Sequence, residues 1–229
     1  MSKRSILTLT MIFAAILLSS CGPTQKVKRT FALNDLSLKA RAAARNGDDQ
    51  RSLELWQEYV ERRPHAHYAQ YELGMTESRM GMYTAAIGHL TTAHDLRPGN
   101  IQYIESLGDT FISAGRAENM MSLMRGTAAE GGNVAGQLRL ARYAQSVGML
   151  DEAKRAINLA MMYSNGESVE PYMAMADFAR HAGDSALEEQ SLRNALWFDP
   201  GSDNLDSRFL ALGITPGPSL ATNPTEDQN

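Results

Sequence analysis

Apolar side chains recur at helical spacing along most of the chain, and residues 68–100 show the pattern well. Ala86, Leu90 and Ala93 follow one another at intervals of four and three residues, which places them on one face of a helix. Pro98 ends that helix, because a proline ring cannot continue a helix interior. Another helical segment precedes it, so this stretch predicts two helices joined by a short turn.

Glycines divide the chain at a regular interval. They stand at Gly47, Gly81, Gly115, Gly148 and Gly183, so that successive intervals are 34, 34, 33 and 35 residues. Self-similarity at such a period is typical of a solenoid, in which each unit is one pair of helices. The predicted units begin near Leu33, His67, Ile101, Val134 and Val169.

Small residues within these units carry a resemblance to a known family. In the second unit, Leu73–Gly74 stands in the first helix, alanines stand in the second, and a proline follows. This arrangement resembles a tetratricopeptide repeat (TPR), whose two helices approach closely and leave room only for small residues. The matching first-helix positions of the other units hold Ala40, Leu107–Gly108, Leu140–Ala141 and Met175–Ala176. The resemblance implies an all-α, right-handed superhelical solenoid of about five helix-turn-helix repeats over residues 33–202.

Several positions depart from the repeat pattern. In the third unit, Met120 stands in place of an alanine and Gly132 in place of the proline, while residues 128–133 predict a loosened helix or loop. In the fifth unit, Glu188 replaces the alanine of the second helix. Residues 203–214 predict a capping helix, since a terminal unit must cover its apolar face. Residues 215–229 are rich in proline and predict a disordered tail.

The first twenty residues predict a secretory signal peptide. A basic start, Lys3–Arg4, precedes an uncharged run from Ile6 to Leu18, and small residues follow. That run is shorter than the 20 or so residues that a membrane-spanning helix needs. The sole cysteine of the chain, Cys21, comes directly after these small residues, and a lone cysteine cannot form an intramolecular disulfide.

Residues 18–22, Leu-Ser-Ser-Cys-Gly, resemble a bacterial lipobox. The resemblance implies cleavage before Cys21, acyl chains such as palmitate on that residue, and a tether over residues 21–32. It also implies the periplasmic face of the outer membrane, because glycine rather than aspartate follows the cysteine. An uncleaved anchor with an incidental cysteine is the alternative.

Charge argues against nucleic acid as a partner. Lys3 and Arg4 would leave with the signal, so that 20 basic side chains remain against 26 acidic ones. Proteins that bind nucleic acid carry strongly basic surfaces instead.

Motifs for chemistry are missing from the sequence. It has no glycine-rich phosphate loop, no His-Glu-x-x-His and no Gly-x-Ser-x-Gly. His65 and His67 have no further ligand at a suitable spacing. The methionines of the helices, among them Met120 and Met162, are read as core residues rather than metal ligands. We therefore expect a non-enzymatic protein without a metal or a cofactor beyond its acyl chains.

In the TPR family the first helices of the repeats line a groove that binds other proteins. The resemblance places these residues in a partner-binding groove: Arg41, Arg45, Tyr68, Tyr71, Met75, Arg79, Glu105, Asp109, Arg139, Arg142, Asp177 and Arg180. An alternative for Tyr68 and Tyr71 is that they cover the preceding repeat. Glu72 and Ser106 stand where chaperone-binding members of the family carry amide or basic groups, which argues against a chaperone-tail receptor.

A lipobox followed by about five such repeats is similar to the pilus-assembly lipoproteins, which include the tight-adherence (Tad) group and the type IV pilotins. The resemblance implies a lipid-anchored adaptor that binds a secretin or another pilus component. The alternatives are an envelope scaffold for peptidoglycan enzymes and a part in outer-membrane protein assembly.

Overall fold

A computed structural model describes residues 24–224 of the 229-residue chain. The chain forms two compact units: unit 1 ends at Thr110, and unit 2 begins at Phe111. The helices of the described residues are α2 (Thr24–Arg45), α3 (Asp49–Arg62), α4 (His67–Arg79), α5 (Tyr83–Leu96), α6 (Ile101–Ser113), α7 (Ala117–Gly131), α8 (Val134–Ser146), α9 (Leu150–Tyr163), α10 (Val169–Ala182), α11 (Ser185–Phe198), α12 (Asp203–Ala211) and the short 3₁₀-helix η1 (Pro218–Leu220).

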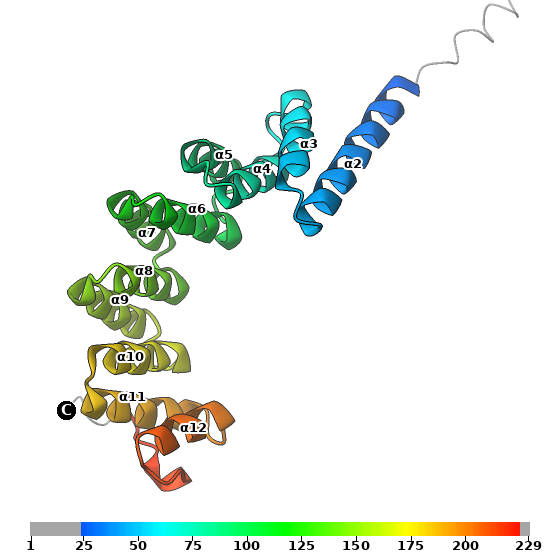
Figure 1. The fold of residues 1–229 in the computed structure, drawn as a ribbon. Coiled ribbons are helices and arrows are strands. Elements are labelled where there is room, and N and C mark those ends of the chain that lie inside the picture. Colours follow the sequence, from blue (N-terminus) through cyan, green and yellow to red (C-terminus); the bar gives the residue numbers. More distant parts are fainter. Residues whose placement is uncertain (1–23, 225–229) are drawn as a thin grey trace, which may run out of the picture. The chain divides into compact units, whose positions relative to one another are not determined.

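Consecutive helices pair in antiparallel fashion, as Figure 1 shows for α4 with α5 and α10 with α11. The predicted all-α fold of helix pairs with a capping helix is therefore confirmed. The repeat glycines occupy the turns between paired helices, and Gly81, for example, has a φ of +75°. Residues other than glycine rarely adopt this left-handed backbone conformation, which explains why glycine recurs there.

The core of unit 1 forms where the helices approach closely. Trp56 and Tyr59 of α3 pack with Ala40 of α2 and Leu73 of α4 in one buried cluster. Gly74 of α4 lies against α5, and a Cβ added there would stand 2.8 Å from Cγ of Leu90 and 3.1 Å from the carbonyl oxygen of Ala86. The small residue at this position thus permits the close approach of the two helices.

The core of unit 2 uses methionine where the repeat pattern has smaller residues. Met120, Met121 and Met124 of α7 are fully buried, in agreement with the core role predicted for them. Met162 of α9 is the exception, because it is 71% exposed and the prediction of a core position for it was wrong. It follows Met161 directly in the helix, so the two side chains point in different directions.

The end of α7 corrects the prediction of a loosened helix or loop over residues 128–133. The helix continues to Gly131, and Gly132 ends it with a left-handed φ of +47°. Asn133 then caps α8, because its Oδ1 accepts a 2.8 Å hydrogen bond from the backbone N–H of Gly136. The two glycines therefore form a tight helix end with a connection of two residues.

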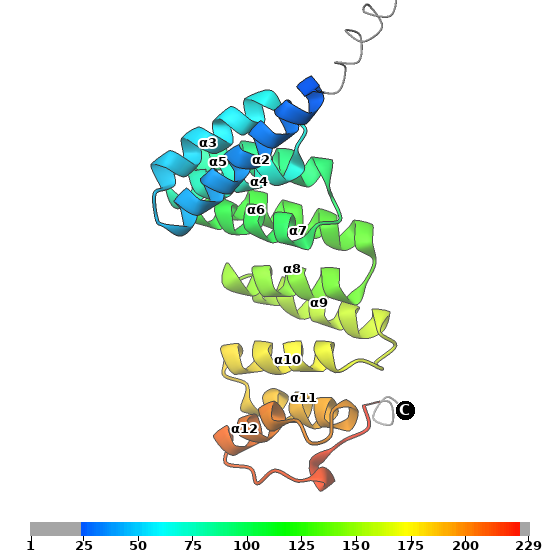
Figure 2. The ribbon, with the colours of Figure 1, turned by 90° about the vertical axis from the view of Figure 1, so that its right-hand side faces the viewer.

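The segment after α12 also differs from its prediction. We predicted disorder over residues 215–229, but residues 214–224 return along α11, as Figure 2 shows. The backbone N–H of Thr222 donates to the carbonyl oxygen of Arg193 at 3.1 Å. Ile214 and Leu220 pack against the cluster that contains the buried Phe209, and this apolar contact holds the segment in place.

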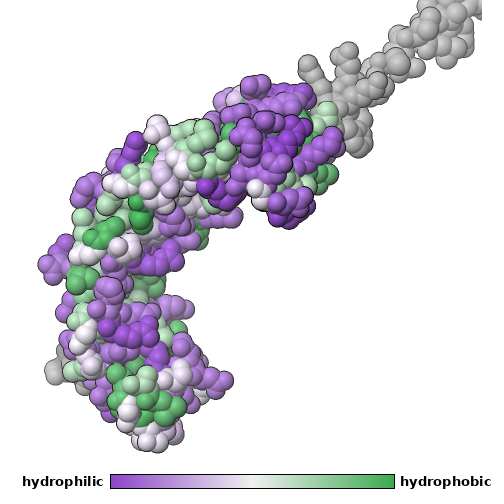
Figure 3. Space-filling model, in the orientation of Figure 1, coloured by the Kyte–Doolittle hydropathy of each residue, from purple (hydrophilic) through white to green (hydrophobic). Residues whose placement is uncertain are grey.

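The surface of the two units differs in character. In Figure 3 the visible face over α2 and α3 is mostly hydrophilic, whereas hydrophobic residues gather over α12 and the segment that follows it. Leu210 of α12, which is 62% exposed, is an exposed apolar residue of this region.

The predicted signal peptide and Cys21 lie outside the described residues. Helix α2 begins at Thr24, within the segment predicted as a tether, 21–32. Among the described residues no helix is both long enough and apolar enough to cross a membrane.

Candidate partner-binding surface

An aromatic pair joins α4 and α6 in unit 1. The rings of Tyr71 and Tyr103 stack with their centroids 4.8 Å apart and an interplanar angle of 24°. Gln102 donates from Nε2 to the Tyr71 hydroxyl at 3.0 Å, and that hydroxyl also lies 3.3 Å from Oγ of Ser106. Tyr103 is buried and Tyr71 is half-buried, so Tyr71 forms the outer ring of a fixed aromatic surface.

Tyr103 is in turn held by its neighbours. Its hydroxyl shares a 2.8 Å hydrogen bond with Nδ1 of His67. Burial, assisted by the nearby Tyr71, raises the pKa of Tyr103 above its ordinary value, so its hydroxyl keeps its proton at physiological pH. Tyr103 was not predicted as a site residue, because a tyrosine at helical spacing predicts a core residue equally well.

Two ion pairs flank this aromatic surface, and each connects different helices. Arg41 of α2 lies 3.3 Å from Oε1 of Glu72 of α4. Arg79 of α4 donates to Oδ1 of Asp49, at the start of α3, from both Nε (3.0 Å) and Nη2 (2.8 Å). The two predicted groove arginines are therefore positioned by acidic partners that the sequence pattern did not identify.

Tyr68 has a different environment from Tyr71. Its ring packs edge-on against Tyr59, with centroids 5.5 Å apart, and against Trp56 at 6.4 Å. The hydroxyls of Tyr59 and Tyr68 are also in contact. Tyr68 therefore covers the preceding repeat, as the structural alternative proposed, whereas Tyr71 contacts the following one.

The remaining predicted residues of unit 1 lie on the same first helices. Arg45 of α2 and Asp109 of α6 are exposed, while Met75 of α4 and Glu105 of α6 are half-buried. Whether these residues contact a partner stays a prediction.

In unit 2 the predicted residues lie on α8 and α10. The guanidinium of Arg142 stands 5.2 Å above the ring of Tyr143, and Arg139 is half-buried. Asp177 of α10 lies 3.1 Å from Nη2 of Arg180. Asp177 also accepts a 2.7 Å hydrogen bond from Arg208 of α12, so this part of the predicted surface is tied to the capping helix.

Between α4 and α5 lies an acid–histidine pair, in which Glu77 is buried and His89 is half-buried. Oε1 of Glu77 is 3.5 Å from Nε2 of His89, whose Nδ1 lies 2.7 Å from Oε1 of Gln70. Burial raises the pKa of Glu77 to about 7 and lowers the pKa of His89. The pair lies inside the helix pair, so we interpret it as part of the packing of unit 1.

Residues 24–224 contain no group of three or more histidine, cysteine or acidic side chains that could hold a metal ion. The surface carries aromatic rings, amides and guanidinium groups, which can bind another molecule by stacking and hydrogen bonds.

Comparison with known proteins gives structural likenesses only. No family model matches the sequence, and no curated protein matches it. Among solved structures, a tetratricopeptide repeat protein from Parabacteroides merdae matches with a TM-score of 0.55 and 15% identity, over 79% of this chain and 73% of that one.

Two MamA structures match over a similar length. MamA from Desulfovibrio magneticus has a TM-score of 0.52 and 13% identity over 75% of this chain and 97% of its own. A further MamA structure has a TM-score of 0.53 and 13% identity over 81% of this chain and 97% of its own. At these identities the likeness establishes the fold alone, and that fold is the one of the tetratricopeptide-repeat proteins.

Proposed function

We propose that this protein is a lipid-anchored adaptor of the bacterial cell envelope that binds a protein partner through the first helices of its repeats. The stacked pair Tyr71–Tyr103 and the polar groups fixed around it carry the proposal. Tyrosine, methionine and arginine are enriched at protein interfaces, and all three occur on this face of α4.

The surface is held in one arrangement before any partner arrives. Gln102 and Ser106 orient the Tyr71 hydroxyl, and Asp49 orients the guanidinium of Arg79. A surface whose side chains are already ordered loses less conformational entropy on binding, which favours affinity.

The partner class is a polypeptide that does not rely on a terminal carboxylate. Glu72 is paired with Arg41, and Ser106 is hydrogen-bonded to Tyr71, so neither position offers a cation to a carboxylate. The lipobox-like Cys21 would hold the adaptor at the outer membrane and raise the local concentration of its partner there. Within this class we propose a role in Tad or type IV pilus assembly, with a secretin subunit as the partner.

Co-purification with the secretin of the same cell tests the proposal. The variant Tyr71→Ala removes the outer ring of the stack and should lower the recovered secretin at least tenfold, with unchanged helical content by circular dichroism. Gln57→Ala, an exposed change on the second helix α3, should leave recovery unchanged. Equal recovery with both variants would contradict the surface, and an absence of secretin from the wild-type sample would contradict the pilus role.

A further inference from the structure

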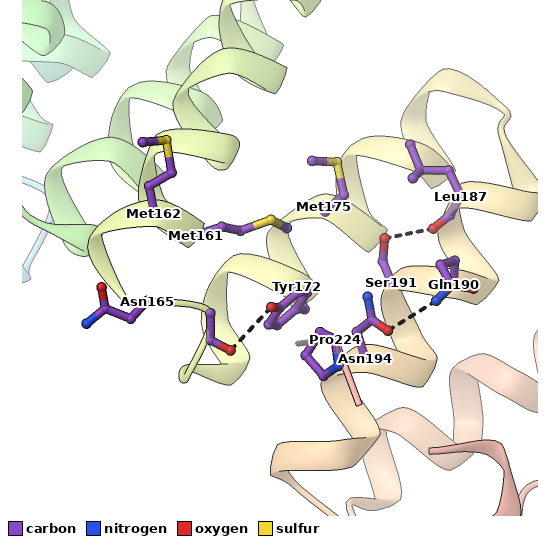
Figure 4. A pocket seen from close by; sticks show the side chains of 11 residues that line it. Met161, Met162, Asn165, Tyr172, Met175, Leu187, Gln190, Ser191, Asn194 and Pro224 are labelled. Carbon is purple, nitrogen blue, oxygen red and sulfur yellow. Dashed lines mark hydrogen bonds between the residues drawn. The ribbon is translucent and has the colours of Figure 1, made fainter. Parts of the chain in front are cut away.

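A cavity opens in unit 2 between α9 and α11, with α10 as its floor (Figure 4). Its volume is about 670 Å³, which lies within the range of roughly 300–1,000 Å³ that is common for ligand sites. Met161 lies on one side, Gln190 and Asn194 on the other, and Tyr172 and Met175 on the floor.

This cavity is separate from the predicted groove. Tyr172 and Met175 face it from α10, whereas the groove residues of the same helix are Asp177 and Arg180, and Asp177 lies five and two positions after the cavity residues. At 100° per residue, five and two positions correspond to rotations of roughly 140° and 160° around the helix axis. Asp177 therefore lies nearly opposite the cavity around α10, while Arg180 is turned by roughly 80° from Tyr172 and 140° from Met175.

The lining is neutral and largely apolar. Among residues 24–224 no charged side chain lines the cavity, and its polar groups are mostly bonded to one another. Gln190 donates from Nε2 to Oδ1 of Asn194 at 3.2 Å, and the Tyr172 hydroxyl donates to the carbonyl oxygen of Gly166 at 3.2 Å. The flexible thioethers of Met161 and Met175 can adapt to apolar groups of different shape.

The chain itself shows what kind of segment lies on this side of α11. Residues 214–224 run along the helix, with the Thr222 N–H on the carbonyl oxygen of Arg193 and a guanidinium contact from Arg193 to the Leu220 carbonyl oxygen at 3.4 Å. These eleven residues carry no charge. Pro224 is buried and lines the cavity, so the cavity continues the contact surface that this segment uses.

We propose that the cavity between α9 and α11 is a second protein-binding site, which takes an extended, uncharged segment of a partner protein with an apolar side chain between Met161 and Met175. The residues of this chain beyond Pro224 fit less well, because Glu226 and Asp227 would bring two carboxylates to a lining whose described residues include no cation. The site does not depend on the first-helix surface proposed above.

Methyl NMR of the full chain, labelled with [¹³C-methyl]methionine, tests the proposal. The probe is the blocked peptide acetyl-Ala-Leu-Pro-Leu-Ala-amide, and acetyl-Ala-Asp-Pro-Asp-Ala-amide is its charged control. We expect saturable shifts of the Met161 and Met175 methyl signals with the neutral probe and binding at least tenfold weaker with the acidic one. Met124, which is fully buried in α7, should not shift.

Cavity-filling variants sharpen the test. Ser191→Leu places a larger side chain in the cavity and should weaken probe binding at least tenfold, with the Met124 signal as the check on folding. Asn194→Leu fills the cavity from its rim and should have the same effect. Arg155→Ala, an exposed change on α9 outside the cavity lining, should leave probe binding unchanged.

Two results would overturn the proposal. One is the absence of any Met161 or Met175 shift at millimolar neutral probe. The other is a variant ending at Pro224 in which these two signals move without a probe and the probe then binds more tightly. That second result would identify residues 225–229 as the occupant in place of a partner.

Discussion

Arg208 of α12 donates a 2.7 Å hydrogen bond from Nη2 to Oε1 of Glu188 of α11, and both side chains are buried. Glu188 stands where the repeat pattern has an alanine. The departure is explained by the capping helix, which supplies the cation that this buried carboxylate needs.

Loss of Arg208 should therefore destabilise unit 2. Arg208→Met leaves the Glu188 carboxylate buried without its partner, which costs about 3–5 kcal/mol. The double variant Glu188→Ala with Arg208→Met removes both charges and should recover most of that loss. Urea unfolding followed by circular dichroism measures the free energy of unfolding of both variants. An equal loss of that free energy in the single and the double variant would contradict a buried ion pair. Arg180→Ala, which is 61% exposed, should change stability by less than about 0.5 kcal/mol.

Gly74 should tolerate no side chain. In Gly74→Ala the new Cβ would meet both Leu90 and the backbone carbonyl of Ala86, so α4 and α5 must separate. We expect a loss of about 1–3 kcal/mol in the free energy of unfolding. Gly88→Ala is the matched control, because nothing lies within 4 Å of a Cβ at that helical position. It should stabilise the protein by about 0.5–1 kcal/mol, and a loss of stability at Gly88 would show that helix propensity does not govern this site.

The contribution of Glu77 to stability should fall as pH rises from about 4.5 through about 7. The folded state raises the pKa of Glu77 from 4.5 to about 7, so it holds this proton more tightly than the unfolded chain does. The contribution of Glu77 to the free energy of unfolding is therefore complete below pH 4.5 and is lost as pH rises through 7. His89, whose pKa burial lowers, acts in the opposite direction below its ordinary value of 6.5.

The variant Glu77→Gln separates the two groups. It should remove the decline between pH 6.5 and about 8, where His89 contributes little, and raise stability at pH 8 relative to the wild type. Urea midpoints measured at half-unit steps of pH provide the test. An unchanged decline in Glu77→Gln would assign the effect to another group.

The segment after α12 should open when its apolar contact is lost. Leu220→Asp places a carboxylate against the Phe209 cluster, so the Thr222 N–H should exchange with solvent roughly tenfold faster. The exposed neighbour Ser219 provides the control, and Ser219→Asp should leave that exchange rate unchanged. Equal rates in the wild type and Leu220→Asp would contradict the packing of Leu220.

Cys21 should decide where the protein resides. Cys21→Ala removes the proposed site of acylation, so a protein anchored there should leave the outer-membrane fraction, either into the soluble fraction or into the inner membrane. Immunoblots of separated membranes measure this. Unchanged outer-membrane fractionation would contradict the lipid anchor.

Much of the fold was predictable because its rules are local. A glycine such as Gly81 is required wherever the turn between paired helices takes a left-handed backbone, and that need repeats with every unit. The small residue at Gly74 is required by a close approach that also repeats. Such positions are visible in one sequence, since each unit provides a copy of the same constraint.

The candidate surface was harder to predict, because its contacts join different repeats. Tyr71 and Tyr103 are 32 positions apart, and their stacking depends on how α4 and α6 pack. Tyr68, only three residues before Tyr71, turns to the preceding repeat instead. Composition also misled us over residues 215–224, where the packing of Leu220 against the Phe209 cluster and the bond from Thr222 to Arg193 hold a proline-rich segment along α11.

The two-residue connection between α7 and α8 has a mechanical consequence. A chain of two residues spans at most about 7 Å. Gly132 is the C-cap of α7 and Asn133 is the N-cap of α8, so neither residue belongs to a free loop. Tension applied along the polypeptide would pass directly from one helix to the next, because there is no slack loop to lengthen first. An adaptor pulled between a membrane and a partner would transmit that load through this joint without extending there.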